Sequence, residues 1–281
     1  MPELPEVETV KRAIAEATTY HKIKAVSTSG QKMRWPIPVN LSAEIEGGLI
    51  AGLRRRGKYI LMDVQTSSGN KTLIIHLGMS GSVRIYPDGE VLAPKKHDHL
   101  TITTTAEKKN VVLVLNDPRR FGGVQLITTQ NAEEHPLLIK MGVEPLGNNM
   151  NAVMMAEALK DKSASIKTTL LDQHIIAGIG NIYASEALYR AGISPKRRAK
   201  NVSTKKLEAL ATAIKGVLQD AIAQGGTSLR DHVQPGGEIG YFVQMLDVYG
   251  RAGQPCNTCG APIQEIRQTG RASFYCSKCQ R

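Results

Sequence analysis

The chain has 281 residues, and its 36 Lys and Arg against 25 Asp and Glu give a formal net charge of +11, which suits a polyanionic partner but also fits a solvated basic face. A hydrophobic content of 41% excludes wholesale disorder, and no apolar run approaches the roughly 18 residues that a membrane-spanning helix needs. Residues 1–8 are acidic and lack the apolar stretch of a secretion signal, so we expect a cytoplasmic protein without a membrane partner.

The first part of the chain predicts one helix followed by short strands. Pro5 suits a first helical turn, and apolar residues at positions 7, 10 and 14 recur on one face, so we expect a helix from Pro5 to Ala17. The runs that follow have no helices between them, which predicts an antiparallel sandwich or barrel over residues 1–135. The strand-like runs are residues 59–62, 72–77, 100–103, 111–115 and 124–127.

The pattern becomes helical after about residue 135. We expect a linker at 136–150 and a helical domain at 151–240, where apolar residues recur three and four apart between Leu207 and Ile222. A Gly-rich loop, 225–237, follows this helix, and a small domain occupies 241–281. The predicted fold class is therefore α+β.

All four cysteines lie near the C-terminus, as two C-x2-C pairs, Cys256 with Cys259 and Cys276 with Cys279. The 16 residues between the pairs match the spacing of a structural zinc site, with two disulfides as the alternative. Four thiolates leave no open position on the metal, so the predicted zinc ion holds a fold and does no chemistry. Alternating residues between the pairs predict a β-hairpin with Arg271 near its tip.

Several short motifs are spread along the whole chain: residues 2–9 (PELPEVET), 56–59 (RGKY), 76–81 (HLGMSG), 117–122 (DPRRFG), 170–173 (LLDQ), 177–183 (AGIGNIY) and the cysteine-bearing tail from 248 to 280. Together they resemble the bacterial formamidopyrimidine-DNA glycosylase family. The resemblance implies an N-terminal helix with a β-sandwich, then a helix-two-turns-helix domain and a β-hairpin zinc finger. It also implies one Zn²⁺ ion, damaged double-stranded DNA as the partner, and a monomer.

The resemblance implies that Pro2 is the nucleophile. Removal of the initiator methionine would leave Pro2 with a secondary amine, and an α-amino group has a pKa of about 7.7–8.0 that a helix N-terminus and desolvation lower further. By resemblance, this amine attacks the sugar C1′ as the damaged base leaves, and β- and δ-elimination follow. Glu3 would handle protons at the opened sugar, with Glu6 ranked second. Lys58 would contact the lesion and a phosphate, and Arg271 would bind the phosphates flanking the lesion.

A glycosylase that extrudes a base must fill the space left in the duplex. Met79, Arg119 and Phe121 match the family's void-filling residues, with Arg119 facing the orphaned base and Phe121 wedged between base pairs. A lone Met or Phe is more often a core residue, so this assignment rests on the resemblance.

Phosphate contacts are expected where a glycine-rich turn opens a helix. Asn181, with Gly178 and Gly180 before it, would present free backbone N–H groups to an anion. Lys167 is a weaker candidate, and by resemblance His99 could face DNA. The histidines at 76, 97 and 99 could suggest a metal site, but for 97 and 99 a hydrogen-bonded pair or a surface pair is more common, and we expect no metal there.

These features predict a bifunctional DNA glycosylase and AP lyase of base excision repair that removes 8-oxoguanine and formamidopyrimidines. The nearest alternative is an endonuclease VIII type enzyme for oxidised pyrimidines, which typically carries Gly where this chain has Leu4. A second alternative is a non-catalytic zinc-ribbon nucleic-acid binder, for which the basic charge and the four cysteines would suffice.

Overall fold

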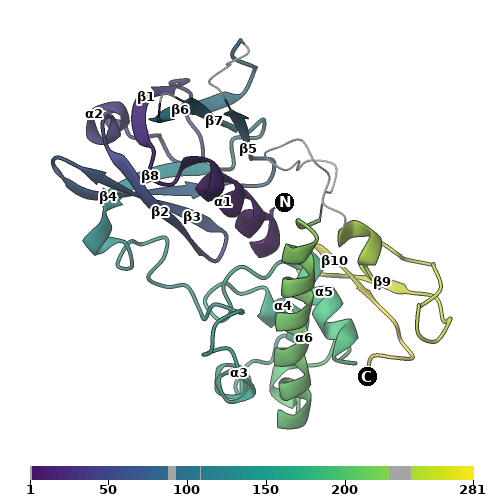
Figure 1. Cartoon of the computed structure of the whole chain (residues 1–281). Helices are drawn as coiled ribbons and strands as arrows, with labels where there is room; N and C mark the ends of the chain where they lie inside the picture. Colours follow the sequence, from purple (N-terminus) through teal and green to yellow (C-terminus); the bar gives the residue numbers. More distant parts are fainter. Residues whose placement is uncertain (1, 88–92, 108, 228–241) are drawn as a thin grey trace. The chain divides into compact units, whose positions relative to one another are not determined.

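The computed structural model describes residues 2–87, 93–107, 109–227 and 242–281 (Figure 1). It divides into two compact units, Met1–Ile139 with Gly225–Tyr241, and Lys140–Gln224 with Phe242–Arg281. The chain passes from the first unit to the second within residues 136–150, the segment expected to be a linker. The start of the Gly-rich loop belongs to the first unit. Most of that loop, from residue 228 onward, lies outside the described residues.

Helix α1, Leu4–Thr18, opens the first unit and confirms the predicted N-terminal helix. Pro5 lies in its first turn, and a capping box joins Glu3 and Glu6, so the backbone N–H groups at the helix start have acceptors. The apolar face made by Val7, Val10 and Ile14 is buried in the core. The side chains of this face therefore fix where the N-terminal residues lie relative to the sheet.

Within the described residues, eight strands form one antiparallel sheet in the order β5-β7-β6-β1-β2-β3-β4-β8. Strands β1 and β2 share only the pair Lys22↔Leu49, whereas β3 and β4 pair along their full length. The sheet therefore consists of two halves, whose apolar side chains meet in one core. The elements are β1 (Lys22–Thr28), α2 (Leu41–Ile45), β2 (Leu49–Arg56), β3 (Tyr59–Thr66), β4 (Gly69–His76), β5 (Ser82–Pro87), β6 (Asp98–Ala106), β7 (Lys109–Asn116), β8 (Gly123–Thr128) and the short η1 (Thr129–Asn131).

The predicted strand runs lie in β3, β4, β6, β7 and β8, which confirms the antiparallel β-rich half. Strands β1 and β5 carry no continuous apolar run, and the run in β2 is only three residues long, Leu49, Ile50 and Ala51. Strand β1 alternates lysines with apolar residues and buries only Ile23 fully, and β2 ends in three arginines. Backbone pairing with neighbouring strands, rather than a hydrophobic pattern, keeps these segments extended.

The second unit is helical and ends in a two-stranded hairpin, so the α+β class is confirmed. The long helix α6 buries the predicted apolar face, including Leu207, Leu210 and Ile214. Among the described residues, no helix combines the length and the apolar character that a membrane crossing requires. The elements are α3 (Ala152–Leu159), α4 (Ile166–Leu170), α5 (Asn181–Arg190), η2 (Ala199–Asn201), α6 (Thr204–Ala223), η3 (Phe242–Met245), β9 (Gln264–Gln268) and β10 (Arg271–Tyr275).

Candidate active site and nucleic-acid interface

The N-terminal residues are enclosed in the first unit. Pro2 is buried, and Glu3 and Glu6 are each only 2% exposed. One oxygen of Glu6, Oε2, accepts a hydrogen bond of 2.8 Å from the backbone N–H of Glu3, and the other, Oε1, accepts one of 2.8 Å from the backbone N–H of Thr227. Glu6 therefore joins the residue next to Pro2 to the first residues of the Gly-rich loop.

The backbone of Gly226 packs directly against this carboxylate. A Cβ placed on Gly226 would lie 3.0 Å from Glu6 Oε1, and the residue has a φ of +82°. Both observations favour glycine, since any side chain would press on Glu6 and would strain the backbone. The start of the loop is thus shaped to hold the Glu6 carboxylate in one position.

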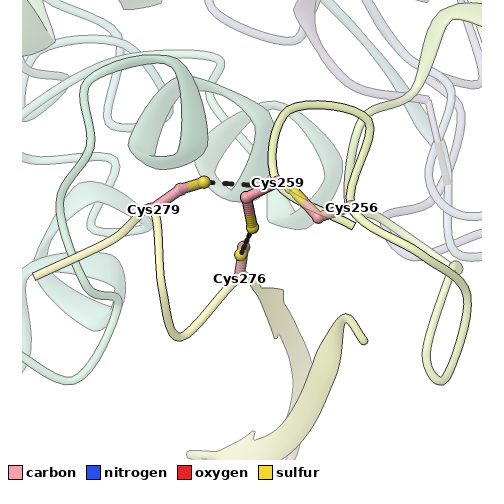
Figure 2. A group of neighbouring side chains, drawn as sticks. All are labelled: Cys256, Cys259, Cys276 and Cys279. Atoms are coloured by element: carbon pink, nitrogen blue, oxygen red, sulfur yellow. Dashed lines mark hydrogen bonds between the residues drawn. The ribbon is translucent and has the colours of Figure 1, made fainter. Parts of the chain in front are cut away.

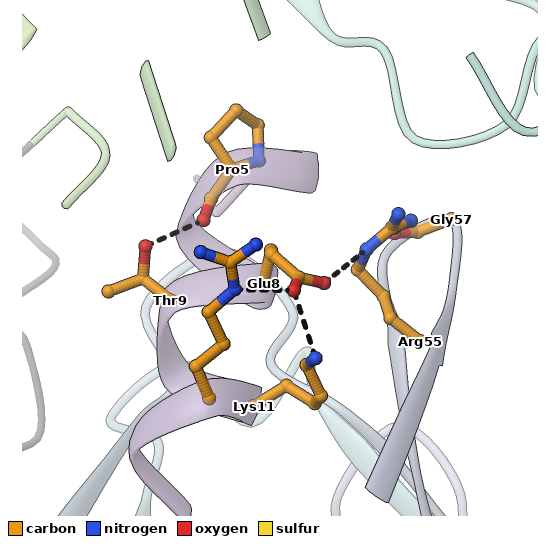
Figure 3. Close-up of polar contacts among 7 residues, drawn as sticks. Pro5, Glu8, Thr9, Lys11, Arg55 and Gly57 are labelled. Carbon is orange, nitrogen blue, oxygen red and sulfur yellow. Dashed lines mark hydrogen bonds and ion pairs between the residues drawn. The ribbon is translucent and has the colours of Figure 1, made fainter. Parts of the chain in front are cut away.

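The turn that carries Lys58 is held against α1 by an ion-pair network (Figure 3). The carboxylate of Glu8 pairs with Lys11 at 2.9 Å and with Arg55 at 3.0 Å, and Arg55 in turn donates to the carbonyl of Gly57 at 3.0 Å. Burial acts to raise the pKa of Glu8, but hydrogen bonds from Lys11 and Arg12 and the charge of Arg55 outweigh it, so the pKa is lowered overall. The ionised carboxylate thereby fixes the backbone immediately before Lys58.

Two of the arginines before Lys58 are not a free basic edge. The Arg54 side chain pairs with Asp63 at 3.2 Å and with Glu133 at 2.7 Å, and the Arg55 side chain is 9% exposed. The positive charges of Arg54 and Arg55 are therefore largely balanced within the first unit.

The structure brings together the three predicted void-filling residues. Met79, Arg119 and Phe121 line one open pocket of about 700 Å³. The guanidinium of Arg119 lies 4.9 Å from the centre of the Phe121 ring, a cation–π distance. Phe121 is 46% exposed and so is not a core residue. An exposed aromatic ring beside an arginine on a pocket rim has the chemistry of a base-pair wedge.

Buried Asp117 shapes the segment that carries Arg119 and Phe121. Its carboxylate accepts a hydrogen bond of 2.7 Å from the Ser80 hydroxyl and one of 2.7 Å from the backbone N–H of Gly122. Gly78 lies against this segment, and a Cβ there would come within 2.3 Å of the Gly122 nitrogen. The motifs at 76–81 and 117–122 are therefore two parts of one packed structure.

His76 lines the same pocket, although its sequence suggested no role beyond that of a possible metal ligand. Its ring lies 4.8 Å from the ring of Tyr59 and 6.3 Å from that of Trp35. Burial and the positive charges of Arg34 and Lys58 lower the pKa of His76 to about 4. The ring is therefore neutral at physiological pH, with one N–H donor and one acceptor.

His99 does not reach the surface, which corrects the expectation that it faces DNA. The side chain is 1% exposed, with Nδ1 lying 3.0 Å from the Ser29 hydroxyl and Nε2 lying 3.0 Å from the carbonyl oxygen of Asp117. Both ring nitrogens are thus used inside the first unit. The residue lies at the start of β6, where the pairing register with β7 shifts between Asp98 and Leu100, so that His99 and Leu100 are both buried.

In the second unit, a glycine-rich turn leads into α5, as predicted. Gly180 is the N-cap and Asn181 is the first helical residue. Gln173 closes the turn by accepting from the backbone N–H of Gly178 at 2.7 Å and by donating to the carbonyl of Ile179 at 2.9 Å. The Gln173 side chain thus fixes the backbone of the turn directly before α5.

Lys167 and Asn181 meet on the finger hairpin. The ammonium of Lys167 donates to the carbonyl of Ala272 at 2.7 Å and to the hydroxyl of Ser273 at 2.7 Å, and the Asn181 amide donates to the same Ala272 carbonyl at 2.9 Å. Ala272 directly follows exposed Arg271 in β10. Lys167 is 1% exposed, so the expectation of a direct phosphate contact is corrected to a contact within the protein.

The four cysteines come together at the base of this hairpin (Figure 2). Their sulfur atoms all lie within 4.8 Å of one another, with 3.9 Å between Cys256 and Cys279 and 3.5 Å between Cys259 and Cys276. Zinc–sulfur bonds of about 2.3 Å in a tetrahedron place sulfur atoms about 3.8 Å apart, so this cluster fits one structural zinc ion. All four are free cysteines, which excludes the alternative of two disulfides in this structure.

The segment leading into the finger is held by one buried carboxylate on α5. Glu186, 1% exposed, accepts from the backbone N–H groups of Asp247, Val248 and Tyr249 at 2.9, 3.0 and 2.8 Å. Burial raises the pKa of Glu186, and these three hydrogen bonds act against the rise. No sequence motif singled out this residue, because one glutamate in an amphipathic helix usually lies on its solvated face.

Three family models match the chain: "Formamidopyrimidine-DNA glycosylase N-terminal domain" over residues 1–124, "Formamidopyrimidine-DNA glycosylase H2TH domain" over 141–233, and "Zinc finger found in FPG and IleRS" over 253–281. The chain is 45% identical to a formamidopyrimidine-DNA glycosylase of Ruegeria pomeroyi, with 100% of both chains covered. It is similar in structure to a Lactococcus lactis FPG mutant bound to Fapy-dG-containing DNA, with a TM-score of 0.89, 34% identity and 100% of both chains covered. It is also similar to MutM bound to DNA containing carbocyclic 8-oxo-G, with a TM-score of 0.87, 34% identity and 100% of both chains covered.

Proposed function

Because the chain belongs to the formamidopyrimidine-DNA glycosylase family, we propose that it excises oxidised purines from duplex DNA and then cleaves the strand as an AP lyase. The observation that carries this proposal is the enclosed N-terminus, where Pro2 and Glu3 lie buried beside the fixed carboxylate of Glu6. A zinc-ribbon protein that only binds nucleic acid would not need a buried N-terminus beside a fixed carboxylate. The substrate class follows the relatives, which include complexes with Fapy-dG and 8-oxo-G DNA.

The proposed chemistry begins at the nitrogen of Pro2 after removal of the initiator methionine. Its lone pair forms a bond to the sugar C1′, and the electron pair of the glycosidic bond leaves with the base, which takes up a proton. Ring opening gives an iminium ion, which acidifies the C2′ proton. Loss of this proton breaks the C3′–O bond, and a second elimination breaks the C5′–O bond. Glu3 is the candidate to exchange protons with the opened sugar.

The void left by the extruded base is assigned to Met79, Arg119 and Phe121. Their shared pocket, the exposed Phe121 ring and the stacked Arg119 guanidinium support this assignment. His76 lines the same pocket with a neutral ring, but its hydrogen bonds go to the backbone of Gly78 and Phe121, so we propose that it shapes the pocket.

We assign the contacts with the DNA phosphates to Lys58, to Arg271 and to the N-terminus of α5 at Asn181. Lys58 follows a turn fixed by ion pairs, and Arg271 precedes a carbonyl held by two donors. In this proposal Lys167 is a positioning residue for the hairpin. Because the proposed substrate is chromosomal DNA, we further propose that the protein works as a monomer at the nucleoid in the cytoplasm.

Borohydride trapping tests the proposal. The protein is mixed with a duplex carrying 8-oxoguanine opposite cytosine, and we expect a covalent complex that peptide mapping assigns to Pro2. A Pro2→Gly variant should form it more slowly or in lower yield. Absence of a complex, or an unchanged rate and yield in Pro2→Gly, would refute the assigned nucleophile. Faster excision of thymine glycol than of 8-oxoguanine would instead favour the endonuclease VIII type of substrate.

A further inference from the structure

Tyr189 places its hydroxyl beside the zinc ligands. The residue lies near the end of α5 and is 9% exposed. Its hydroxyl oxygen lies 3.2 Å from the sulfur of Cys256 and 2.8 Å from the hydroxyl of Thr258. Its ring packs in the finger's small apolar core, beside residues that include Val248 and Phe274. The phenol hydroxyl of Tyr189 thus points at a cysteine sulfur inside this apolar core.

The chemistry of a zinc-bound cysteine fixes the direction of these hydrogen bonds. A cysteine that ligates zinc is a thiolate and has no proton to give. The phenol of Tyr189 is protonated at neutral pH and has a single proton, so it donates that proton to Cys256. The hydroxyl of Thr258 must then donate to the phenol oxygen. The three groups form a directed chain from Thr258 through Tyr189 to Cys256.

We propose that Tyr189 is a positioning residue of the zinc site, which binds the Cys256 thiolate through its phenol and thereby retains the metal. The proposal rests on the four-cysteine zinc site and goes beyond the glycosylase activity. Groups that hydrogen-bond to metal ligands orient them, and their loss typically costs about 10–100-fold in metal affinity.

The same helix holds the hairpin at two places. Eight residues before Tyr189, the Asn181 amide donates to the Ala272 carbonyl. At a rise of about 1.5 Å per residue, these two anchor points are about 12 Å apart along α5. One rigid element therefore contacts both the metal end of the finger and the strand residue next to Arg271. Through the Tyr189 phenol, retention of zinc therefore depends on the same helix that positions this strand.

The test compares Tyr189→Phe with Tyr86→Phe, a control that removes a tyrosine hydroxyl in the β-rich unit. Tyr86 lies under the guanidinium of Arg84 in β5 of the first unit, whereas the four cysteines belong to the second unit. Full-length, zinc-loaded proteins are mixed with excess chromogenic chelator, and zinc release is followed by absorbance. We expect release from Tyr189→Phe to be about 10-fold faster or more, with Tyr86→Phe unchanged. Thr258→Val should have a smaller effect, because the phenol can still donate to sulfur.

A second measurement separates hydrogen bonding from packing. Cobalt(II) replaces zinc in each protein, and the thiolate-to-cobalt charge-transfer band is recorded. Loss of a hydrogen bond to sulfur raises the energy of its lone pairs, so the band of Tyr189→Phe should move to lower energy. Faster zinc release without a spectral shift would overturn the proposal in favour of a packing role. Equal release rates in Tyr189→Phe and the wild type would overturn it outright.

Discussion

The double contact made by Glu6 predicts a large effect from a one-atom change. In Glu6→Gln the amide retains one acceptor oxygen and replaces the other with an NH₂ donor. The backbone N–H groups of Glu3 and Thr227 both need acceptors at 2.8 Å, so one of them would face a donor instead. The site is 2% exposed, and Gly226 closes it on one side. Water therefore cannot easily replace the lost acceptor.

The expected cost follows from this geometry. A buried donor left without its acceptor costs about 1–3 kcal/mol, so the free energy of unfolding of the first unit should fall by about that amount. If the first turn shifts to relieve the mismatch, Pro2 moves with it and covalent trapping slows. If the full 1–3 kcal/mol is added to the activation barrier of covalent trapping, the trapping rate should fall by about 5–150-fold.

Urea unfolding and borohydride trapping on a preformed abasic site measure the two effects. The abasic substrate needs no base excision, so it reports on the amine alone. Glu16→Gln is the matched control, since Glu16 is an exposed glutamate on the same helix. If Glu6→Gln matches Glu16→Gln in both unfolding free energy and trapping rate, the inferred role of the Glu6 carboxylate is wrong.

Three further predictions concern other parts of the molecule. Glu186→Gln replaces one of two acceptor oxygens for backbone N–H groups and should destabilise the second unit by about 1–3 kcal/mol in urea unfolding, while the exposed Glu208→Gln should not. The pKa of His76 falls from 6.5 unfolded to about 4 folded, so the unfolded state binds the extra proton between these values and stability should fall as pH drops through this window, by at most about 3 kcal/mol. A His76→Gln variant should lose that part of the pH dependence, and an unchanged profile would contradict the burial argument. Arg271→Ala should weaken duplex binding and reduce the slope of log affinity against log salt by about 0.9, and an unchanged slope would exclude a phosphate contact.

The sequence predicted elements whose pattern is local. The α1 face repeats every three or four residues, and the finger hairpin alternates between two cysteine pairs, so both could be located before the structure. The packing of β1 could not, because its one fully buried residue, Ile23, lies among exposed lysines. Its place in the sheet depends on long-range pairing with β6, which no local period encodes.

The candidate site divides in the same way. Motif residues such as Phe121 could be named by resemblance, whereas the roles of Lys167 and His99 depended on burial. A lysine in a short helix and a histidine at a strand start are usually solvated, so only the tertiary structure reveals that both point inward. Tyr189 gave no signal at all, since its partners lie about 70 residues further along the chain.

The anchor beneath Arg271 is a main-chain atom, and this sets where variation is tolerated. The Ala272 carbonyl is present whatever side chain occupies that position, so no replacement of that side chain deletes the acceptor. In these two hydrogen bonds only the donors, Lys167 and Asn181, can be lost by substitution, whereas the bond from Lys167 to buried Ser273 also needs that hydroxyl. Variants with randomised exposed residues on the hairpin should therefore keep the hydrogen bonds from α4 and α5 to the Ala272 carbonyl. Substitution of Lys167 or Asn181 should weaken the attachment of the finger, although neither residue belongs to it.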